Sequence, residues 1–379
     1  MSTYTYLDHA ATTPVRPEAV TAMLPYFDER FANPSGSHRF ARAARAAVDD
    51  AREVVAGVLG CEPGEVVFTS GGTEGDNTAV LGAVARRPGV AVCPAAEHHA
   101  VLAAVEQVRH RIVPTTATGA VDLDALRDTL RDCPDVAVVS VMAVNNEVGS
   151  VNHLADIAAV VRESAPGALL HTDAVQAPCW LDLRDITPHV DLLSLSAHKF
   201  GGPKGVGVLV AKAGVPYTPL LVGGGQERER RSGTHNVPGI IAMAEALRLT
   251  DAERAAELPR LTALRDRLVD RLQAELPGVH ETVPRDAKVA GSAHVCIEGV
   301  ENEALLFLLD EAEVCASAAS ACAAGAMEPS HVLAAMGVPR GLALGALRLT
   351  LGRTTTEDDV ERGADAVVGA VRRLRRAAS

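Results

Sequence analysis

The sequence predicts an α/β protein with a mostly parallel sheet and a second, smaller α+β domain. Two observations lead to this prediction. Apolar runs alternate with segments of helical period from about residue 40 to 215, whereas shorter strand-like runs and helices follow after about residue 255. Several runs are apolar throughout, which is typical of strands that are covered by helices on both faces.

Six strands are expected in the first region. They are EVVFTS (65–70), VAVC (90–93), VAVVSVM (136–142), ALLHTD (168–173), VDLLSLS (190–196) and VGVLVA (206–211). The segments EHHAVLAAVEQVRH (97–110) and VDLDALRDTL (121–130) are expected to be crossover helices. A long helical segment over 236–276 leads out of this region, and Pro259 is expected to break or bend it.

The smaller domain is expected to contain strand-like segments, a helix over 303–310 and a final helix over 357–376. The strand-like segments are AHVCIEGV (293–300), VCASAASAC (314–322) and ALRLTLG (346–352). We place residues 15–255 in the large domain, and residues 1–14 together with 256–379 in the small one.

Composition and charge exclude several classes of function. The formal net charge of −12 disfavours nucleic acid or an anionic membrane as the main partner. The N-terminus lacks the pattern of a signal peptide, and no segment reaches the ~18 apolar residues of a membrane span. Seven scattered cysteines without a CxxC pair argue against a disulfide framework and a structural zinc site. We therefore expect a cytoplasmic protein without a metal site.

Three local patterns suggest one ligand. VVFTSGGTEGDN (66–77) runs from a strand into a helix start, where backbone N–H groups and the Thr73 hydroxyl could bind phosphate, although it could also be an ordinary turn. Asp173 lies at the carboxyl end of a buried strand, where ligands of α/β sheets bind, and Gln176 follows three residues later, although Asp173 could also be a helix N-cap.

Lys199 follows the next strand, and a desolvated lysine becomes the nucleophilic amine that Schiff-base chemistry needs. Lys204 is its nearby rival, in a setting that favours an exposed turn. A phosphate site, a carboxylate for a ring nitrogen and a lysine for an aldehyde together fit pyridoxal 5′-phosphate (PLP).

The chain resembles the cysteine desulfurases, class V members of the fold-type I PLP enzymes. Ten blocks carry the resemblance in the family's order: YLDHAATTP (6–14), NPSGSH (33–38), TSGGTEGDN (69–77), EHHAVL (97–102), NNEVG (145–149), HTDAVQ (171–176), SAHKFGGPKGVG (196–207), GGGQERERRSGT (223–234), SACAAGAMEPSHVL (320–333) and LRLTLGR (347–353). The resemblance implies a large domain with a mostly parallel seven-stranded sheet flanked by helices. It also implies PLP as the cofactor.

The resemblance further implies roles for individual residues. Lys199 would hold the cofactor and move protons at the substrate Cα, Asp173 would pair with the ring nitrogen, and His98 would stack on the ring. The remaining residues implied to bind the cofactor are Gln176 and Asn146 near the ring, and Gly72, Thr73, Ser196, His198 and Thr234 at the phosphate, with Thr234 coming from a second subunit. Arg348, helped by Asn33, would bind the substrate carboxylate. His98, Asn146, Thr234 and Arg348 also have ordinary structural interpretations.

Cys322 is the nucleophile that the resemblance implies. Its small-residue surroundings indicate an accessible loop, whereas Cys315 is expected to be a buried, inert strand residue. The implied reaction converts L-cysteine to L-alanine and leaves a persulfide on Cys322 for an acceptor protein, with His98 a candidate to help form the thiolate. Two residues, Ala319 and Gly75, differ from the glycine and serine usual in the family, and the loop length resembles the housekeeping-type, long-loop branch. A homodimer is implied.

Other functions stay open at this point. A selenocysteine lyase or a class V aminotransferase would have the same fold, but an aminotransferase does not need Cys322. A non-catalytic sulfur-transfer scaffold would not need both Lys199 and Cys322. A nucleotide-binding protein would need a P-loop lysine after the glycines, which is absent. The destination of the sulfur could be iron–sulfur cluster assembly, tRNA thiolation or another thio-product.

Overall fold

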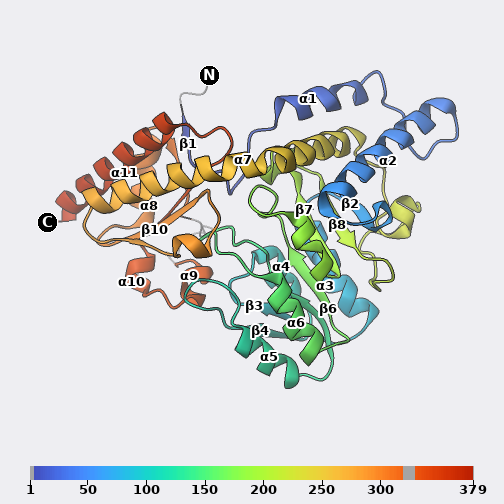
Figure 1. Ribbon diagram of the computed structural model, residues 1–379, viewed down its shortest axis with the longest axis horizontal. Helices are drawn as coiled ribbons and strands as arrows, with labels where there is room; N and C mark the ends of the chain where they lie inside the picture. The colour runs from blue at the N-terminus through green and yellow to red at the C-terminus, as the bar shows by residue number, and fades with distance from the viewer. Residues whose placement is uncertain (1–3, 319–328, 379) are drawn as a thin grey trace.

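The computed structural model describes residues 4–318 and 329–378 (Figure 1). Within these residues the largest sheet has seven strands in the order β2-β8-β7-β6-β5-β3-β4. The strands are β2 (Val66–Thr69), β3 (Val90–Pro94), β4 (His110–Val113), β5 (Val136–Ser140), β6 (Leu169–Asp173), β7 (Leu192–Ser196) and β8 (Gly207–Ala211). Only β8 runs antiparallel to its neighbours, so the predicted mostly parallel sheet is confirmed.

Helices cover both faces of this sheet. The helices of this region are α1 (Pro17–Met23), α2 (Arg39–Leu59), α3 (Gly72–Arg86), α4 (His99–Glu106), α5 (Leu123–Arg131) and α6 (Leu154–Ser164). Every residue of β2, β3, β5, β7 and β8 is buried, which explains why these strands are apolar runs without alternation. The six predicted strands are therefore confirmed, with ends shifted by one or two residues.

Strand β4 was not predicted. The segment 97–110 was expected to be one helix, but α4 ends at Glu106 and His110 begins β4. β4 is an edge strand that pairs only with β3, and its residues Arg111 and Ile112 are exposed. An exposed edge strand has no continuous apolar run, so the sequence of β4 did not distinguish this strand from the end of a helix.

Helix α7 (Val237–Glu275) runs the length of the molecule and joins its two parts (Figure 1). The expectation that Pro259 breaks this helix is wrong, because the helix continues through it. Proline cannot donate to the carbonyl four residues earlier, at Ala255. Both Pro259 and Ala255 are exposed, so water can hydrate the freed carbonyl.

The C-terminal part is a smaller α+β unit. Its strands form two sheets, β12-β10-β9 and β1-β11, made from β1 (Thr5–Tyr6), β9 (Val279–Glu281), β10 (Ser292–Ile297), β11 (Val314–Cys315) and β12 (Ala346–Thr350). Its helices are α8 (Asn302–Glu311), α9 (His331–Ala335), α10 (Arg340–Ala343) and α11 (Glu357–Ala378). Short 3-10 helices complete the chain: η1 (Leu24–Tyr26), η2 (Pro63–Glu65), η3 (Leu183–Asp185), η4 (Thr187–His189), η5 (Ala197–Lys199), η6 (Gln226–Glu229) and η7 (Arg285–Ala287).

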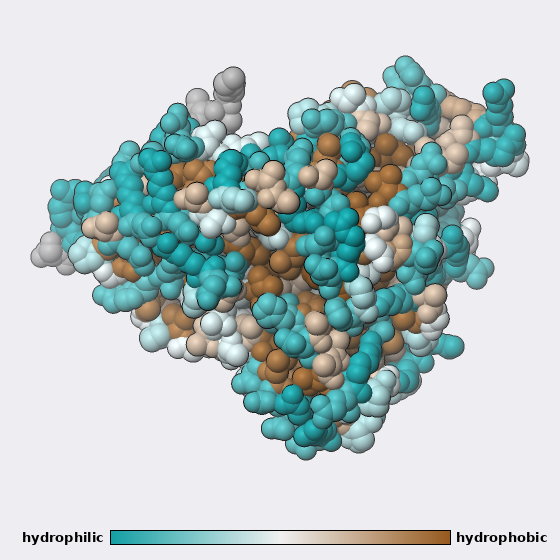
Figure 2. Space-filling view, viewed as in Figure 1, coloured by the Kyte–Doolittle hydropathy of each residue, from teal (hydrophilic) through white to brown (hydrophobic). Residues whose placement is uncertain are grey.

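The apolar core divides along α7. One cluster of buried residues includes the large sheet and reaches Leu247 of this helix, and a second begins at Leu261 and includes the C-terminal unit. Leu7 belongs to the second cluster, so the N-terminal strand packs with the C-terminal part of the chain. On the face drawn in Figure 2, hydrophobic residues gather at the centre, below α7.

Two further observations bear on the sequence predictions. None of the described helices is long and apolar enough to cross a membrane. The prediction that Cys315 is buried is wrong, because this residue is half-exposed at the end of the two-residue strand β11.

Candidate active site

A cavity of about 520 Å³, called here the main cavity, lies where β6 and β7 end and α3 begins. Its lining contains the following residues predicted for the site: Gly72, Thr73, His98, Asn146, Asp173, Gln176, Ser196, His198 and Lys199. Carboxyl ends of neighbouring parallel strands meet at one edge of a sheet, which is why residues far apart in sequence converge here.

One end of the main cavity is suited to an anion. Helix α3 begins at Gly72, and among the described residues no side chain caps its first turn. A Cβ at Gly72 would lie 2.6 Å from Cγ2 of Val175, so the backbone approaches Val175 as closely as only glycine allows. The start of a 15-residue helix presents N–H groups and the positive end of the helix dipole to this space.

The guanidinium of Arg231 lies beside the start of α3, although it does not line the main cavity. It makes an ion pair with Glu74 in the first turn of α3, at 2.8 Å from Nε to Oε1. The carboxylate of Glu74 also accepts a hydrogen bond from the Ser70 N–H at 2.8 Å. Arg231 therefore offsets the negative charge that Glu74 would otherwise bring near an anion.

Asp173 supplies the carboxylate in the wall of the main cavity. It is 7% exposed, and its Oδ1 accepts a hydrogen bond from the Val175 N–H at 2.9 Å. Burial raises the pKa of Asp173, while His98, the Val175 N–H and Lys199 act in the opposite direction. A cationic ring nitrogen placed beside Asp173 would favour the ionised carboxylate.

Lys199 lies in η5, directly after β7. Its Nζ donates hydrogen bonds to the carbonyls of Ala10 at 2.5 Å and Ala11 at 2.9 Å. Burial, with the charge of Arg348 acting in the same direction, lowers the pKa of Lys199 to about 8. About a tenth of the amine is then unprotonated at pH 7, and this form is the nucleophile.

His98 and Gln176 flank these two groups. The Nδ1 of His98 caps α4 by accepting a hydrogen bond from the Ala100 N–H at 3.1 Å, and its ring is exposed to the main cavity. Partial removal from water lowers the pKa of His98, so the imidazole is neutral and can lie against an aromatic ring. Gln176 donates from Nε2 to the Ala10 carbonyl at 2.8 Å.

Asn145 and Asn146 have different roles in the turn after β5. Asn145 is buried and its Oδ1 accepts hydrogen bonds from the N–H groups of Glu147 and Val148, so it holds the turn. Asn146 is half-buried and lines the main cavity. Of the two, Asn146 is the one that can reach a ligand.

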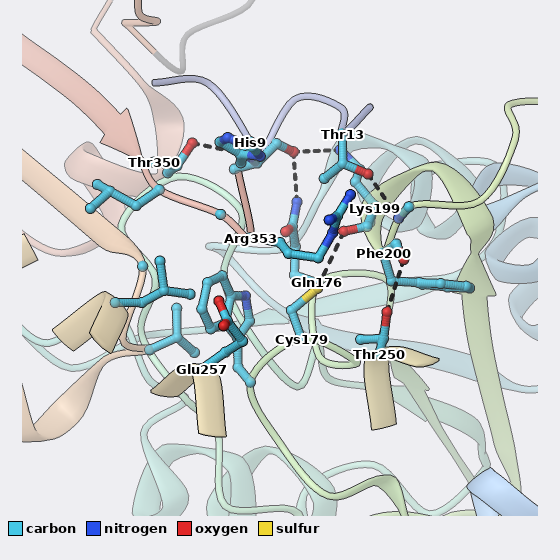
Figure 3. Close-up of a pocket in the computed structure, with 18 of the residues that line it drawn as sticks. His9, Thr13, Gln176, Cys179, Lys199, Phe200, Thr250, Glu257, Thr350 and Arg353 are labelled. Atoms are coloured by element: carbon cyan, nitrogen blue, oxygen red, sulfur yellow. Dashed lines mark hydrogen bonds between the residues drawn. The ribbon is translucent and has the colours of Figure 1, made fainter. Parts of the chain in front are cut away.

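A second cavity, of about 80 Å³, adjoins the main one and shares Lys199, Gln176, Asn146 and Val144 with it. Figure 3 shows Gln176 and Lys199 together against the segment that carries His9 and Thr13. The N-terminal segment thus supplies the carbonyls that hold both side chains.

Arg348 lies on β12 and is 5% exposed. Its Nη2 pairs with Asp8 Oδ1 at 2.7 Å, and its Nη1 donates to the Asn146 carbonyl at 2.9 Å. The Nε is buried and has no hydrogen-bond partner in the described part of the chain. The ordinary structural interpretation of Arg348, an ion pair, is therefore realised; the residue contacts Asn146 of the main cavity without lining that cavity itself.

Among the described residues, the structure does not bring Asn33 and Thr234 of this chain to the main cavity. Asn33 is exposed in the turn before α2, where its Oδ1 accepts a hydrogen bond from the Ser35 N–H at 2.9 Å. Thr234 is exposed and lines a separate small pocket of this chain, not the main cavity. Cys322, with its neighbour Ala319, lies outside the described residues.

Sequence reasoning missed a buried polar group beneath Asp173. His171 lies two residues earlier on β6 and so points to the same face. Its Nδ1 lies 2.8 Å from Ser140 Oγ and its Nε2 lies 2.9 Å from Ser194 Oγ, and Asp76 Oδ1 is 3.6 Å away. Burial lowers the pKa of His171 to about 3 and raises that of Asp76 well above its usual value. The sequence shows that His171 lies two residues before Asp173, but it does not show the partners of His171 on β5, β7 and α3.

These groups fit PLP. The main cavity holds a helix start suited to an anion, with a glycine whose Cβ would crowd Val175, a buried carboxylate for a ring nitrogen, and an amine of lowered pKa for an aldehyde. Asp76 Oδ1, also in the lining, is buried and has no hydrogen-bond partner among the described residues. Fold and site together define an α/β enzyme of the PLP-dependent class.

Comparison with known proteins gives the family. Residues 5–362 match the family model described as aminotransferase class-V. The chain is 44% identical to an IscS-like cysteine desulfurase of Mycobacterium tuberculosis, covering 98% of both, and 42% identical to the cysteine desulfurase IscS of Methanosarcina thermophila, covering 98% of this chain and 92% of that one. A solved structure titled NifS-like protein superposes with a TM-score of 0.91 at 33% identity, covering 97% of this chain and 99% of the other.

The chain therefore belongs to the class V aminotransferase family and, within it, to the cysteine desulfurases. The predictions of family, fold class and PLP as cofactor are confirmed. Its assignment to the long-loop branch stays a prediction.

Proposed function

We propose that this protein converts L-cysteine to L-alanine and takes the released sulfur as a persulfide on Cys322. The observation that carries the proposal is the main cavity, into which a buried carboxylate, Asp173, and an amine of lowered pKa, Lys199, both face. The names of the relatives support the choice of L-cysteine as substrate.

PLP, when bound, withdraws electrons from the bonds of an amino acid joined to its aldehyde. Lys199 would hold the cofactor and move the proton at the substrate Cα. Asp173 would keep the ring nitrogen protonated, and His98 would stack on the ring. Gln176 and Asn146 would contact the ring from the side of the N-terminal segment.

The phosphate would lie at the start of α3. Gly72 and Thr73 would bind it there, with Ser196 and His198 from the end of β7. Burial and the nearby lysines lower the pKa of His198 to about 4, so it would act as a neutral hydrogen-bond donor.

Thr234 would complete the phosphate site from a second copy of the chain. Its exposed position outside the main cavity of its own chain supports a homodimer. We place Asn33 near the substrate on the basis of the family resemblance alone.

Arg348 would bind the substrate carboxylate. Its buried Nε lacks a partner, which is a costly arrangement unless an anion occupies the site. The present pair with Asp8 leaves part of the guanidinium fork available.

The sulfur step balances without a further reactant. The C–S bond of L-cysteine breaks, an S–S bond forms to Cys322, and the proton of the Cys322 thiol is transferred so that L-alanine is released. His98 is the candidate to assist formation of the Cys322 thiolate. The persulfide would then pass its outer sulfur to an acceptor protein, for iron–sulfur cluster assembly, tRNA thiolation or another thio-product.

We further infer a cytoplasmic location and a division into a large domain of residues 15–255 and a small domain of residues 1–14 and 256–379. The separation of the two apolar clusters between Leu247 and Leu261 of α7 supports this division.

The test is to incubate the purified holoenzyme with L-cysteine and to measure alanine and protein-bound persulfide. We expect the wild type to form both products. Cys322→Ala, assayed with a reductant present, is expected to form alanine at a much lower rate and no protein-bound persulfide. Cys315→Ala is the matched control, because Cys315 is half-exposed at the other end of the same segment. Persulfide formation that survives in Cys322→Ala would contradict the proposal, as would transfer of the amino group without release of sulfur.

A further inference from the structure

The loop after Gly223 contains an unusual backbone turn. Glu227, Arg228 and Glu229 have φ values of 50°, 57° and 64°, so three consecutive residues other than glycine are left-handed. Each such residue brings its Cβ close to the following carbonyl and costs free energy. Strained backbone of this kind persists only where the surrounding structure holds it, and it concentrates at functional sites.

Glu227 holds this turn. Its side chain is 2% exposed and forms a two-point ion pair with Arg52, at 2.8 Å from Nη1 to Oε2 and 2.6 Å from Nη2 to Oε1. It also accepts hydrogen bonds from the Phe68 N–H at 3.0 Å and from His235 at 2.7 Å between Nε2 and Oε1. The carboxylate thus joins α2, β2 and both ends of the loop.

The segment that follows the turn reaches the anion end of the main cavity from outside. Arg231 pairs with Glu74 in the first turn of α3, and Thr234 is exposed three residues later. His235, next to Thr234, is itself hydrogen-bonded to Glu227. The conformation that exposes Thr234 is therefore fixed on both sides by the same carboxylate.

We propose that Glu227 is a positioning residue that holds the loop so that Thr234 is presented to the cofactor phosphate of a second copy of the chain. This inference rests on the proposed function, because it takes the binding of PLP and the role of Thr234 from there. Glu227 acts through Thr234 and does not itself touch the cofactor.

The experiment measures the dissociation constant of PLP from the apo-protein for four variants. Thr234→Ala removes one hydrogen bond to a charged phosphate and is expected to weaken binding about tenfold. Glu227→Gln keeps the shape but loses the ion pair with Arg52, and is expected to weaken binding by a similar factor. The matched control Glu229→Gln, in the same left-handed turn but exposed, is expected to change it by less than about twofold.

The double variant Glu227→Gln/Thr234→Ala separates positioning from general stability. If Glu227 acts through Thr234, the double variant binds PLP as weakly as either single variant and not about a hundredfold more weakly than the wild type. Multiplied effects would overturn the inference, as would unchanged binding by Glu227→Gln. The proposed function fails separately, if the wild type binds no PLP.

A milder variant covers the case in which Glu227→Gln does not fold. His235→Gln removes the imidazole contact and leaves the Arg52 pair in place. We expect weaker PLP binding in the same direction, with the thermal midpoint of the apo-protein unchanged. A lowered midpoint with unchanged PLP binding would show a purely structural role and overturn the inference.

Discussion

Gly75, where the family resemblance leads us to expect serine, packs closely against Ser194. A Cβ at position 75 would lie 2.7 Å from Oγ and 3.1 Å from Cβ of Ser194. That Ser194 hydroxyl is the partner of the buried His171, at 2.9 Å. Gly75→Ala is therefore expected to displace this hydroxyl and leave the Nε2 of His171 without its hydrogen bond, while the contact of Nδ1 with Ser140 stays in place.

The magnitude follows from three opposing contributions. Alanine in a helix interior is favoured over glycine by ~1 kcal/mol. Crowding in a packed core costs ~1–3 kcal/mol, and a buried imidazole nitrogen left without its hydrogen bond costs ~1–3 kcal/mol. We expect a net destabilisation of about 3 kcal/mol for Gly75→Ala, measured by urea unfolding of the apo-protein.

Ser194→Ala provides the matched test. Alone it removes the hydrogen bond to His171 and is expected to cost ~1–3 kcal/mol. The double variant Gly75→Ala/Ser194→Ala lacks the hydroxyl that the new methyl group would contact. Its destabilisation is therefore expected to be about 2 kcal/mol smaller than the sum of the two single-variant values. The reasoning would be refuted if the two single-variant destabilisations added within ~0.5 kcal/mol, or if Gly75→Ala were stabilising. Either result would mean that the Ser194 side chain can adopt another rotamer at no cost in stability.

Three further predictions concern stability and charge. His171 has a pKa of about 3 in the folded protein and 6.5 as its ordinary value, so between these pH values the unfolded chain binds more protons than the folded one. The contribution of the buried neutral imidazole to the free energy of unfolding is therefore complete above pH 6.5 and falls by up to ~1.4 kcal/mol per pH unit below it. Urea unfolding of His171→Gln should show a shallower loss of stability across this pH range. Asp8→Asn is expected to lower the pKa of Lys199 further, because Asp8 raises it at present, which the pH dependence of Lys199 acetylation in the apo-protein measures; an unchanged or raised pKa would contradict this. Pro259→Ala is expected to stabilise the apo-protein by ~1–3 kcal/mol, because it restores a donor to an unbroken helix, and a lower thermal midpoint would show that proline sets a bend which the packing needs.

The sequence was most informative where burial is complete. β5 and β7 are buried along their whole length and appear as unbroken apolar runs, so they were predicted closely. β4 is an exposed edge strand and was assigned to a helix. Pro259 was expected to break or bend a helix because local propensity argues so, whereas the two halves of α7 pack against two separate cores and the helix runs on through Pro259 without a break.

For the site, strand ends were the useful signal. Asp173 ends one predicted strand and Lys199 lies just after the next, and these adjacent parallel strands bring them to one cavity. The pair between Asp8 and Arg348 spans nearly the whole chain, and no local pattern indicates it. Glu227 was equally hidden, because its partners Arg52 and Phe68 lie on other elements and its backbone conformation is one that glutamate rarely adopts.

One measurement examines the pairing of Lys199 with the cofactor most directly. The holoenzyme is reduced with borohydride and digested, and the peptides that carry a pyridoxyl group are identified by mass spectrometry. Two lysines line the main cavity, Lys199 and the exposed Lys204. We expect the label on Lys199 alone; a label on Lys204, or none on either residue, would contradict the assignment on which the proposed chemistry depends.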